Sequence, residues 1–311
     1  MNLLNAEKEI LKYGNEIIDI LLYDNTTKHN IIWATDGYEK FGSSYHAYDE
    51  MTSLSISSLC FKVIQPRVLK SKEEQKTRTK KRAEVFTPSW MCNLQNNLID
   101  NEWFERKNVF NTEIKNGWVS NVEKITFPNT KGKTWLDYVM LNRMECACGE
   151  APYLTSRYDA ATASVIEIND RIGLLDRKLR VVNENTENEK DWIKYAKKAF
   201  QSIYGFEYQG DNLLLARENL LFTYIENFIY KFNKSPEYKD IKKIAEIISW
   251  NIWQMDGLTF NVPLHDKIQY CDQITIFGIQ EFDFECKIKD WHSRKIPIIK
   301  FKDYIKGDKN E

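Results

Sequence analysis

The middle of the chain alternates short apolar segments with longer stretches of helical periodicity, and this alternation limits the folds open to it. The alternating segments are, in chain order, 138–144, 163–182, 192–201, 202–207, 212–232, 241–249 and 251–258. Strands that alternate with helices in this way pair in parallel, because each helix carries the chain back along the sheet. The expected fold is therefore α/β, a mainly parallel sheet with helices on both faces. Ligands of such sheets bind beyond the carboxyl ends of the strands.

The composition fits a folded protein that is neither a membrane protein nor a strongly basic one. Of the 311 residues, 42% are hydrophobic and 13% aromatic, which is too apolar for a disordered chain. No run of about 18 apolar residues predicts a membrane span. The net charge of −1 means that a nucleic-acid surface must come from local clusters of Lys and Arg.

The first residues and the cysteines of the chain favour a cytoplasmic protein. The first residues mix Glu and Lys with Leu and Ile, unlike a secretory signal. The six cysteines have no paired metal-binding spacing with the four histidines, so we expect reduced thiols and no metal site.

Three regions are expected along the chain: an N-terminal appendage with a basic linker (1–80), a core (81–265), and C-terminal strands with a tail (266–311). From Lys70 to Arg82 the sequence has seven basic and two acidic residues. This run is either a solvated loop or a strap that contacts phosphates. In the second interpretation, the DNA-contacting side chains are Lys76, Arg78, Lys80 and Lys81.

Two segments at predicted strand ends carry an acidic residue followed by a turn. In the first, Glu145 precedes small residues and Gly149, and a turn of small residues lets a ligand approach the backbone. An ordinary tight turn is the alternative. In the second, Glu207 ends an apolar strand, where a carboxylate can accept both hydroxyls of a ribose. Asp211, just beyond it, can instead cap the following helix.

A third strand pattern runs into Asp256 and Gly257. A carboxylate at this place can accept a hydrogen bond from an adenine amino group. Taken alone, an Asp in a surface turn is the simpler interpretation.

Together with Phe86-Thr87-Pro88 upstream, these segments resemble the cofactor-binding half of the adenine-specific DNA methyltransferases of restriction–modification systems. The resemblance covers roughly residues 82–260, with four motifs in the family's order. It implies a Rossmann-like methyltransferase fold, with the N-terminal appendage added, that binds S-adenosylmethionine. It places Phe86, Thr87 and Pro88 over the cofactor, Glu145, Ala147 and Gly149 around its methionine end, Glu207 on its ribose, and Asp256 on the adenine amino group.

The sequence departs from the family pattern in two places. Cys146 stands where the family has Pro, and Ala151 and Pro152 stand near a position that is usually Gly. The family's Asp/Asn-Pro-Pro-aromatic motif, which holds the flipped base, is also missing, since the chain has no Pro-Pro pair. Asp290 and Trp291 offer a hydrogen-bond acceptor and a stacking ring in the expected region, so they are the predicted catalytic pair. A charged, half-exposed strand end is the alternative.

Three functions follow as hypotheses. The first is methyl transfer to the amino group of adenine in DNA, in restriction–modification or phage defence, without a metal. The second is a cofactor- or DNA-binding subunit that needs a partner methyltransferase, specificity or nuclease chain. The third is methyl transfer to RNA. The four motifs favour the first hypothesis, and the missing Pro-Pro pair favours the second.

Overall fold

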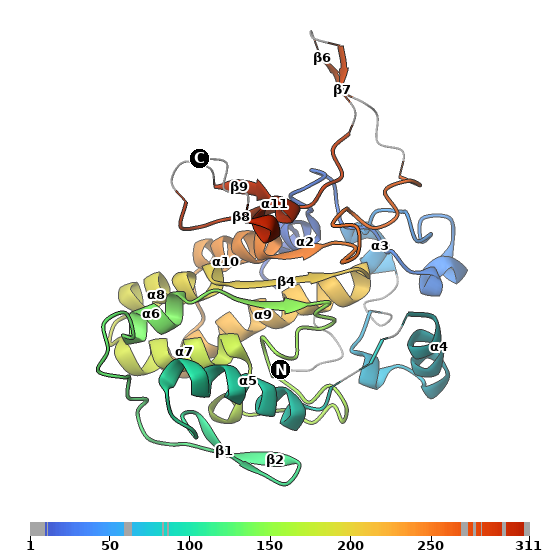
Figure 1. Cartoon of the computed structure of the whole chain (residues 1–311). Helices are drawn as coiled ribbons and strands as arrows, with labels where there is room; N and C mark the ends of the chain where they lie inside the picture. The colour runs from blue at the N-terminus through green and yellow to red at the C-terminus, as the bar shows by residue number, and fades with distance from the viewer. Residues whose placement is uncertain are drawn as a thin grey trace.

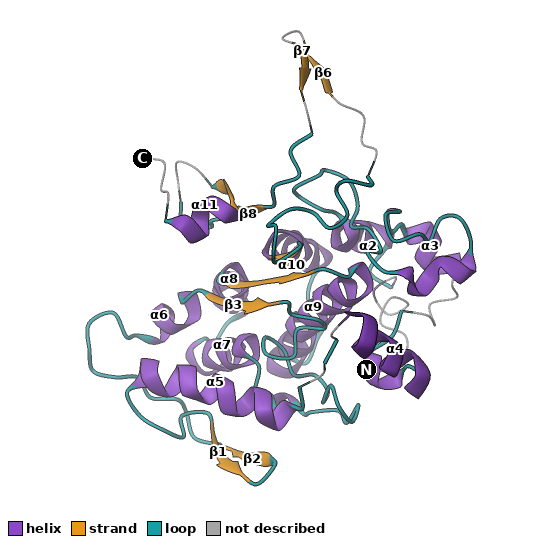
Figure 2. Ribbon diagram, turned by 45° about the vertical axis from the view of Figure 1, so that its right-hand side comes forward, coloured by secondary structure: helices purple, strands orange, loops and turns teal. Residues whose placement is uncertain are grey.

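The computed structural model describes residues 10, 12–58, 64–82, 84–85, 87–268, 273–275, 278–280, 282–293 and 297–307. Its helices are α2 (Asn15–Leu22), α3 (Ser53–Ser58), α4 (Lys72–Arg82), α5 (Ser89–Phe104), α6 (Trp135–Met140), α7 (Leu174–Asn185), α8 (Glu189–Gln201), α9 (Gly210–Phe232), α10 (Tyr238–Asn251) and α11 (Phe301–Lys306). Its strands are β1 (Asn111–Ile114), β2 (Gly117–Ser120), β3 (Arg143–Cys146), β4 (Ile203–Glu207), β5 (Ile252–Gln254), β6 (Gln273–Thr275), β7 (Gly278–Gln280), β8 (Lys287–Lys289) and β9 (Ile298–Lys300). Figure 1 shows their arrangement and Figure 2 their distribution between helix and strand.

A small parallel sheet lies at the centre of the fold. Its strand order is β3-β4-β5, and Gly205 of β4 pairs with Glu145 on one side and Ile252 on the other. The other strands among the described residues form antiparallel pairs, β1–β2, β6–β7 and β8–β9. The α/β class and the parallel pairing of these three segments are confirmed. Because the strands run the same way, their carboxyl ends meet at one edge.

Alternate residues of β4 point into two different apolar clusters, as the period of a strand requires. Ile203 belongs to the large cluster formed with α7, α8, α9 and α10. Tyr204 and Phe206 belong to a smaller one, in which Phe301 packs at a ring-centroid distance of 5.0 Å from Trp253. The long helices therefore cover one face of the sheet, while the C-terminal segment with β8, β9 and short α11 covers the other.

The N-terminal residues share the large core instead of forming a separate unit. Ile17, Leu21 and Trp33 are buried in the same cluster as the helices of the sheet. The Gln254 side chain accepts a hydrogen bond from the backbone N–H of Ile32 (2.9 Å) and donates one to its carbonyl oxygen (2.8 Å). A side-chain amide can satisfy both backbone groups in this way, so β5 and residue 32 are joined much as two strands would be.

Two segments differ from the sequence-based expectation for local reasons. The apolar run at 138–144 is divided between α6 and β3, because Thr134 and Asp137 form a capping box that starts a helix. The helical pattern at 163–182 forms a short 3-10 helix at Ile168–Asp170 and becomes α-helical only at Leu174, where the backbone N–H of Gly173 donates to Asp176 Oδ2 (3.1 Å).

The run from Lys70 to Arg82, expected to be a linker, contains helix α4. Figure 1 shows α4 on the side toward which β3 and β4 point, while α6 and α8 lie toward the other end of the strands. Among the described residues, no helix is both long and apolar enough to cross a lipid bilayer.

We predict that Gly210→Ala destabilises the fold by about 1–3 kcal/mol, the usual cost of an overpacked site. An added Cβ at this first residue of α9 would lie 2.1 Å from the carbonyl oxygen of Ile32 and 2.7 Å from the sulfur of Met51. Gly37→Ala is the control, since its Cβ would meet nothing closer than 3.6 Å. Urea unfolding of both variants tests the prediction, and equal midpoints would contradict it.

Candidate functional site

A cavity of about 610 Å³ opens at the carboxyl ends of the three parallel strands. Its walls are the end of β3 and the turn after it (145–150, 152 and 153), the end of β4 and the turn after it (206–209), and two residues after β5, Met255 and Gly257. Residues of the 80–87 segment close a further side. The position agrees with the general rule for open α/β sheets, whose ligands lie beyond the carboxyl strand ends.

The turn after β3 exposes its backbone to the cavity. Ala147, Gly149 and Ala151 have positive φ angles of 49°, 55° and 63°. A left-handed conformation costs an Ala about 1–2 kcal/mol, and such strained residues cluster at ligand sites. The hydrogen bond from Cys148 N to Phe206 O (2.8 Å) fixes the turn against β4. Ala147 and Gly149 line the cavity, and since their side chains are only a methyl group and a hydrogen, a ligand can approach the main chain closely there, whereas Ala151 is fully buried.

Two carboxylates at the strand ends hold the cavity wall in place. Glu145 accepts hydrogen bonds from the backbone N–H groups of Leu154 (3.2 Å) and Tyr153 (3.4 Å), which closes the turn. Glu207 accepts from Gly149 N (2.8 Å) and Gln209 N (3.1 Å), which joins the ends of β3 and β4. A carboxylate has about four lone-pair sites, so Glu207 retains capacity for further donors from a ligand.

Burial raises the pKa of both carboxyl groups. For Glu207, the N–H donors of Gln209 and Gly149 oppose the rise, and the charges of Asp211 and Glu84 add to it. The pKa of Glu145 is raised well above its ordinary value by burial, against its two backbone donors, and the charge of Glu207 contributes to the rise. A ligand that donates hydrogen bonds or carries positive charge would stabilise the ionised forms.

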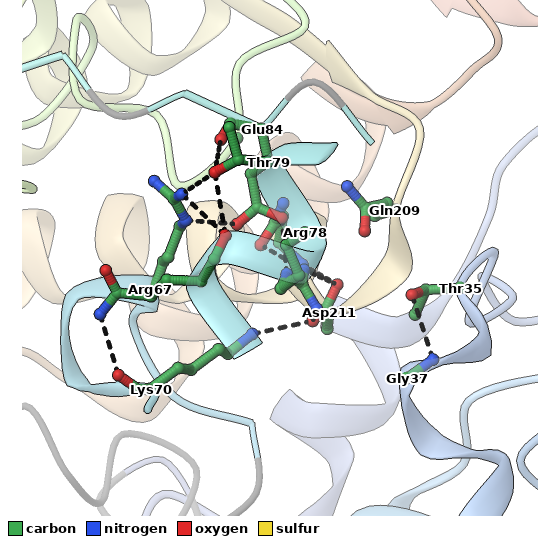
Figure 3. A network of polar contacts seen from close by, with 12 residues as sticks. Thr35, Gly37, Arg67, Lys70, Arg78, Thr79, Glu84, Gln209 and Asp211 are labelled. Carbon is green, nitrogen blue, oxygen red and sulfur yellow. Dashed lines mark hydrogen bonds and ion pairs between the residues drawn. The ribbon is translucent and has the colours of Figure 1, made fainter. Parts of the chain in front are cut away.

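A buried ion cluster attaches the segment before the cavity to the start of α9. Figure 3 shows the carboxylate of Asp211 between Lys70 and Arg78. Its Oδ2 lies 3.1 Å from Lys70 Nζ and 2.9 Å from an Arg78 nitrogen, and it also accepts a hydrogen bond from the Tyr38 hydroxyl (2.8 Å). Arg78 Nε in turn donates to Glu84 Oε2 (2.5 Å). The cluster thereby holds Glu84 at the cavity wall.

Electrostatics keep this cluster ionised. Burial by itself would raise the pKa of Asp211, but the charges of Lys70 and Arg78 outweigh burial and hold the pKa well below its usual range. Asp211 was a candidate helix cap in the sequence. The N-cap of α9 is instead Gln209, and the Asp211 carboxylate serves the ion cluster.

The predicted DNA-contacting residues separate into different environments. Lys76 and Lys80 are exposed on α4, and Lys80 lies at the cavity. Arg78 points into the protein and donates to Glu84, Asp211 and Asn212, so its guanidinium is not presented to a phosphate. The side chain of Lys81 lies outside the described residues.

The predicted cofactor-binding residues are largely brought together. Glu145, Ala147, Gly149, Glu207 and Thr87 all line the cavity.

Two others, Pro88 and Asp256, do not line the cavity, and Phe86 lies outside the described residues. Pro88 is the N-cap residue of α5. The side chain of Asp256 accepts from Leu258 N (2.8 Å) and so stabilises its own turn, although its neighbours Met255 and Gly257 reach the cavity.

The predicted catalytic pair lies at the opposite end of the strands. Trp291 Nε1 donates to Asn251 Oδ1 (2.7 Å), and Asn251 immediately precedes β5. The same Asn251 donates to the carbonyl of Ile203, the first residue of β4 (2.9 Å). Asp290 bonds through its backbone N–H to Pro297 O (2.8 Å), beside β9. The structure therefore does not bring Asp290 and Trp291 to the cavity.

The polar residues of the cavity that were not predicted from the sequence include Glu84, Glu150, Gln209 and Asn212. Gln209 stands two positions after Glu207, and Glu84 stands two positions before the Phe86-Thr87-Pro88 segment. Closeness in the sequence to a predicted motif was therefore the signal that could have found these two residues. Glu150 accepts from Arg67 N (2.7 Å) and from the Tyr158 hydroxyl, contacts that no sequence pattern indicates.

Comparison of the chain with protein-family models, with curated proteins and with solved structures finds no match. Within the described part of the chain, no three His, Cys, Asp or Glu side chains come close enough together to hold a metal ion. The site must therefore be interpreted from its own geometry.

We predict that Asp211→Asn lowers the free energy of unfolding by about 3–5 kcal/mol near neutral pH, because Lys70 would be left buried without its counter-charge and Arg78 would keep only Glu84. The folded-state pKa of Asp211 lies below the ordinary value of 3.8. The free energy that the Asp211 carboxylate contributes to folding is therefore complete above pH 3.8 and is lost as the pH falls toward the folded-state pKa.

Urea unfolding of wild type and variant at neutral and at acidic pH measures this effect. The difference between them should shrink on acidification. Glu189→Gln, which breaks a half-exposed pair with Lys234, is the control and should leave the midpoint almost unchanged. A pH-independent difference would show that the charge of Asp211 does not stabilise the cluster.

Proposed function

We propose that the chain binds S-adenosylmethionine in this cavity and takes part in transfer of its methyl group to the amino group of adenine in DNA. The observation that carries the proposal is the hydrogen bond from Gly149 N to Glu207. It joins a small-residue turn and a strand-end carboxylate, the two features that the resemblance assigns to opposite parts of this cofactor. The strand order β3-β4-β5 is further support, since it suits one half of a Rossmann-like sheet.

The residues at the cavity fit the chemistry of this cofactor. The exposed backbone around Ala147 and Gly149 suits the methionine end, and the remaining lone pairs of Glu207 suit the two hydroxyls of a ribose. When bound, the cofactor supplies a methyl group on an activated sulfonium. The protein's own contribution is to position the reactants and exclude water.

The DNA part of the proposal depends on α4. Lys76 and Lys80 are one helical turn apart, both exposed, and Lys80 lines the cavity. A phosphate backbone that follows these two lysines would pass the opening of the site. Arg78, on the inner face of α4, holds the helix in place through Asp211.

A second candidate is a cofactor- or DNA-binding subunit whose target base is held by a partner chain. The observation that favours it is the position of Asp290 and Trp291 at the amino ends of the strands, away from the cavity.

We expect calorimetry to show binding of S-adenosylmethionine, weakened by about 1–3 kcal/mol in Glu207→Gln, because hydrogen bonds to an ionised acceptor are removed. Ribose hydroxyls donate to the ionised carboxylate, whose pKa is raised. Affinity should therefore fall as the pH is lowered from neutrality through that pKa. Part of this pH dependence should disappear in Glu207→Gln, although the charges of Glu145, Asp211 and Glu84 remain.

Glu187→Gln, an exposed position outside the cavity, is the control. The location is checked by alkylation: Cys146 lines the cavity and is exposed, while Cys92, Cys148 and Cys286 are buried. Bound cofactor should slow the alkylation of Cys146 in peptide maps. Binding that is unaffected by Glu207→Gln and leaves Cys146 reactive would place the ligand elsewhere.

We predict that the double variant Lys76→Gln/Lys80→Gln flattens the salt dependence of DNA binding by about two units of slope, because each lysine that no longer neutralises a phosphate lowers the slope by about one. Lys190→Gln/Lys194→Gln is the matched control, with two exposed lysines at the same spacing on α8. An unchanged slope in the first variant would mean that α4 does not contact DNA.

Methyl transfer from labelled cofactor to mixed-sequence DNA separates the two candidates. Transfer by the chain alone, retained in Asp290→Ala, is expected if the chemistry occurs at the cavity. Transfer abolished in Asp290→Ala would restore the sequence-based catalytic pair. Transfer that appears only when a second chain is added would establish the subunit function.

A further inference from the structure

The polar lining of the cavity is strongly unbalanced toward acceptors and negative charge. Its side chains include four carboxylates, those of Glu84, Glu145, Glu150 and Glu207, but Lys80 is the one basic side chain among its described lining residues. Lys80 is exposed to solvent, so its charge is screened more than the charges of the buried groups.

Two acceptor atoms beside the cavity have no hydrogen-bond donor among the described residues. Gln209 lines the cavity, its residue is 5% exposed, and its Oε1 atom is fully buried without a donor. Glu84 Oε1 is likewise buried without a hydrogen bond, and Arg67 Nε lies 3.6 Å from it. Leaving a buried acceptor unsatisfied is costly. Both atoms add to the excess of acceptors over donors in the cavity wall.

The carboxylates also destabilise one another's charged forms. Burial raises the pKa of Glu150, and the charge of Glu84 adds to the rise. The charge of Glu207 also raises the pKa of Glu145, and the charge of Glu84 also raises the pKa of Glu207. A positive charge in the cavity would offset these repulsions and stabilise the ionised carboxylates.

The carboxylates surround the cavity instead of converging on one point. No three acidic, His or Cys side chains of the described residues are close enough for a metal ion. Separated acceptors fit an organic cation whose charge and donor groups are spread over its length.

We propose that this cavity selects its ligand by positive charge, so that S-adenosylmethionine binds more tightly than its demethylated product. This inference rests on the proposed function. In methyl transfer the C–S bond breaks with its electrons left on sulfur, and the adenine nitrogen forms the new N–C bond and loses a proton to solvent. The sulfonium thereby becomes a neutral thioether. The product loses the charge that the cavity favours, which promotes its release.

The test compares three ligands by calorimetry on the full chain at pH 8. They are S-adenosylmethionine, S-adenosylhomocysteine, and sinefungin, in which a carbon bearing an amino group replaces the methylated sulfur. We expect the two cationic ligands to bind on the order of tenfold more tightly than the thioether, as for one partly screened charge interaction.

Two opposite variants at Gln209 make the test specific. Gln209→Glu should raise the preference for the cationic ligands several-fold and Gln209→Lys should lower it, whereas a merely structural role would shift both in the same direction. The matched controls are Gln95→Glu and Gln95→Lys, at an exposed position on α5. They should leave the preference unchanged.

Equal or tighter binding of S-adenosylhomocysteine by the wild type would overturn the inference and leave the proposed function standing. Shifts in the same direction for both Gln209 variants would also overturn it. If none of the three ligands binds the wild type, the proposed function itself fails.

Discussion

The carboxylate of Asp211 lies fully buried in the first turn of α9 and receives Lys70, Arg78 and the Tyr38 hydroxyl. These partners come from segments far apart in the chain, and without them the segment that precedes the cavity would have no ionic attachment to α9. A buried ion cluster of this kind adds little net stability when intact but is costly to break. Its effect here is to fix one arrangement, in which Glu84 faces the strand ends.

The cavity follows from that attachment together with the parallel sheet. The sheet brings the ends of β3, β4 and β5 to one edge, and Glu207 then joins the first two by binding Gly149 N. The left-handed Ala147 leaves backbone exposed where a larger side chain would block the wall. The result is a polar, acceptor-rich site of about 610 Å³, whose chemistry suits a cationic, donor-rich ligand better than an anionic one.

Sequence reasoning performed best where a signal is local. Apolar segments ending in an acidic residue predicted the strand ends at Glu145 and Glu207, because the strand period and the following turn are encoded by neighbours. It failed where a residue's role depends on a distant partner. Arg78 was expected to contact DNA, yet it is neutralised by an Asp 133 positions away. In the same way, the fully buried Arg177 of α7 is bonded to Asp100 (2.7 Å), a partner 77 positions away in the chain.

The sequence by itself determined the α/β class, the three parallel strands and the positions of their polar ends, since periodicity and turn residues act over a few neighbours. Only the tertiary structure decided which charges are internal and which face solvent, because a buried ion pair joins residues whose separation in the chain is unrelated to their distance in space. It also placed Trp291 at the amino ends of the strands, against Asn251, because packing and one hydrogen bond of 2.7 Å fix its position, and no motif spacing contains that information.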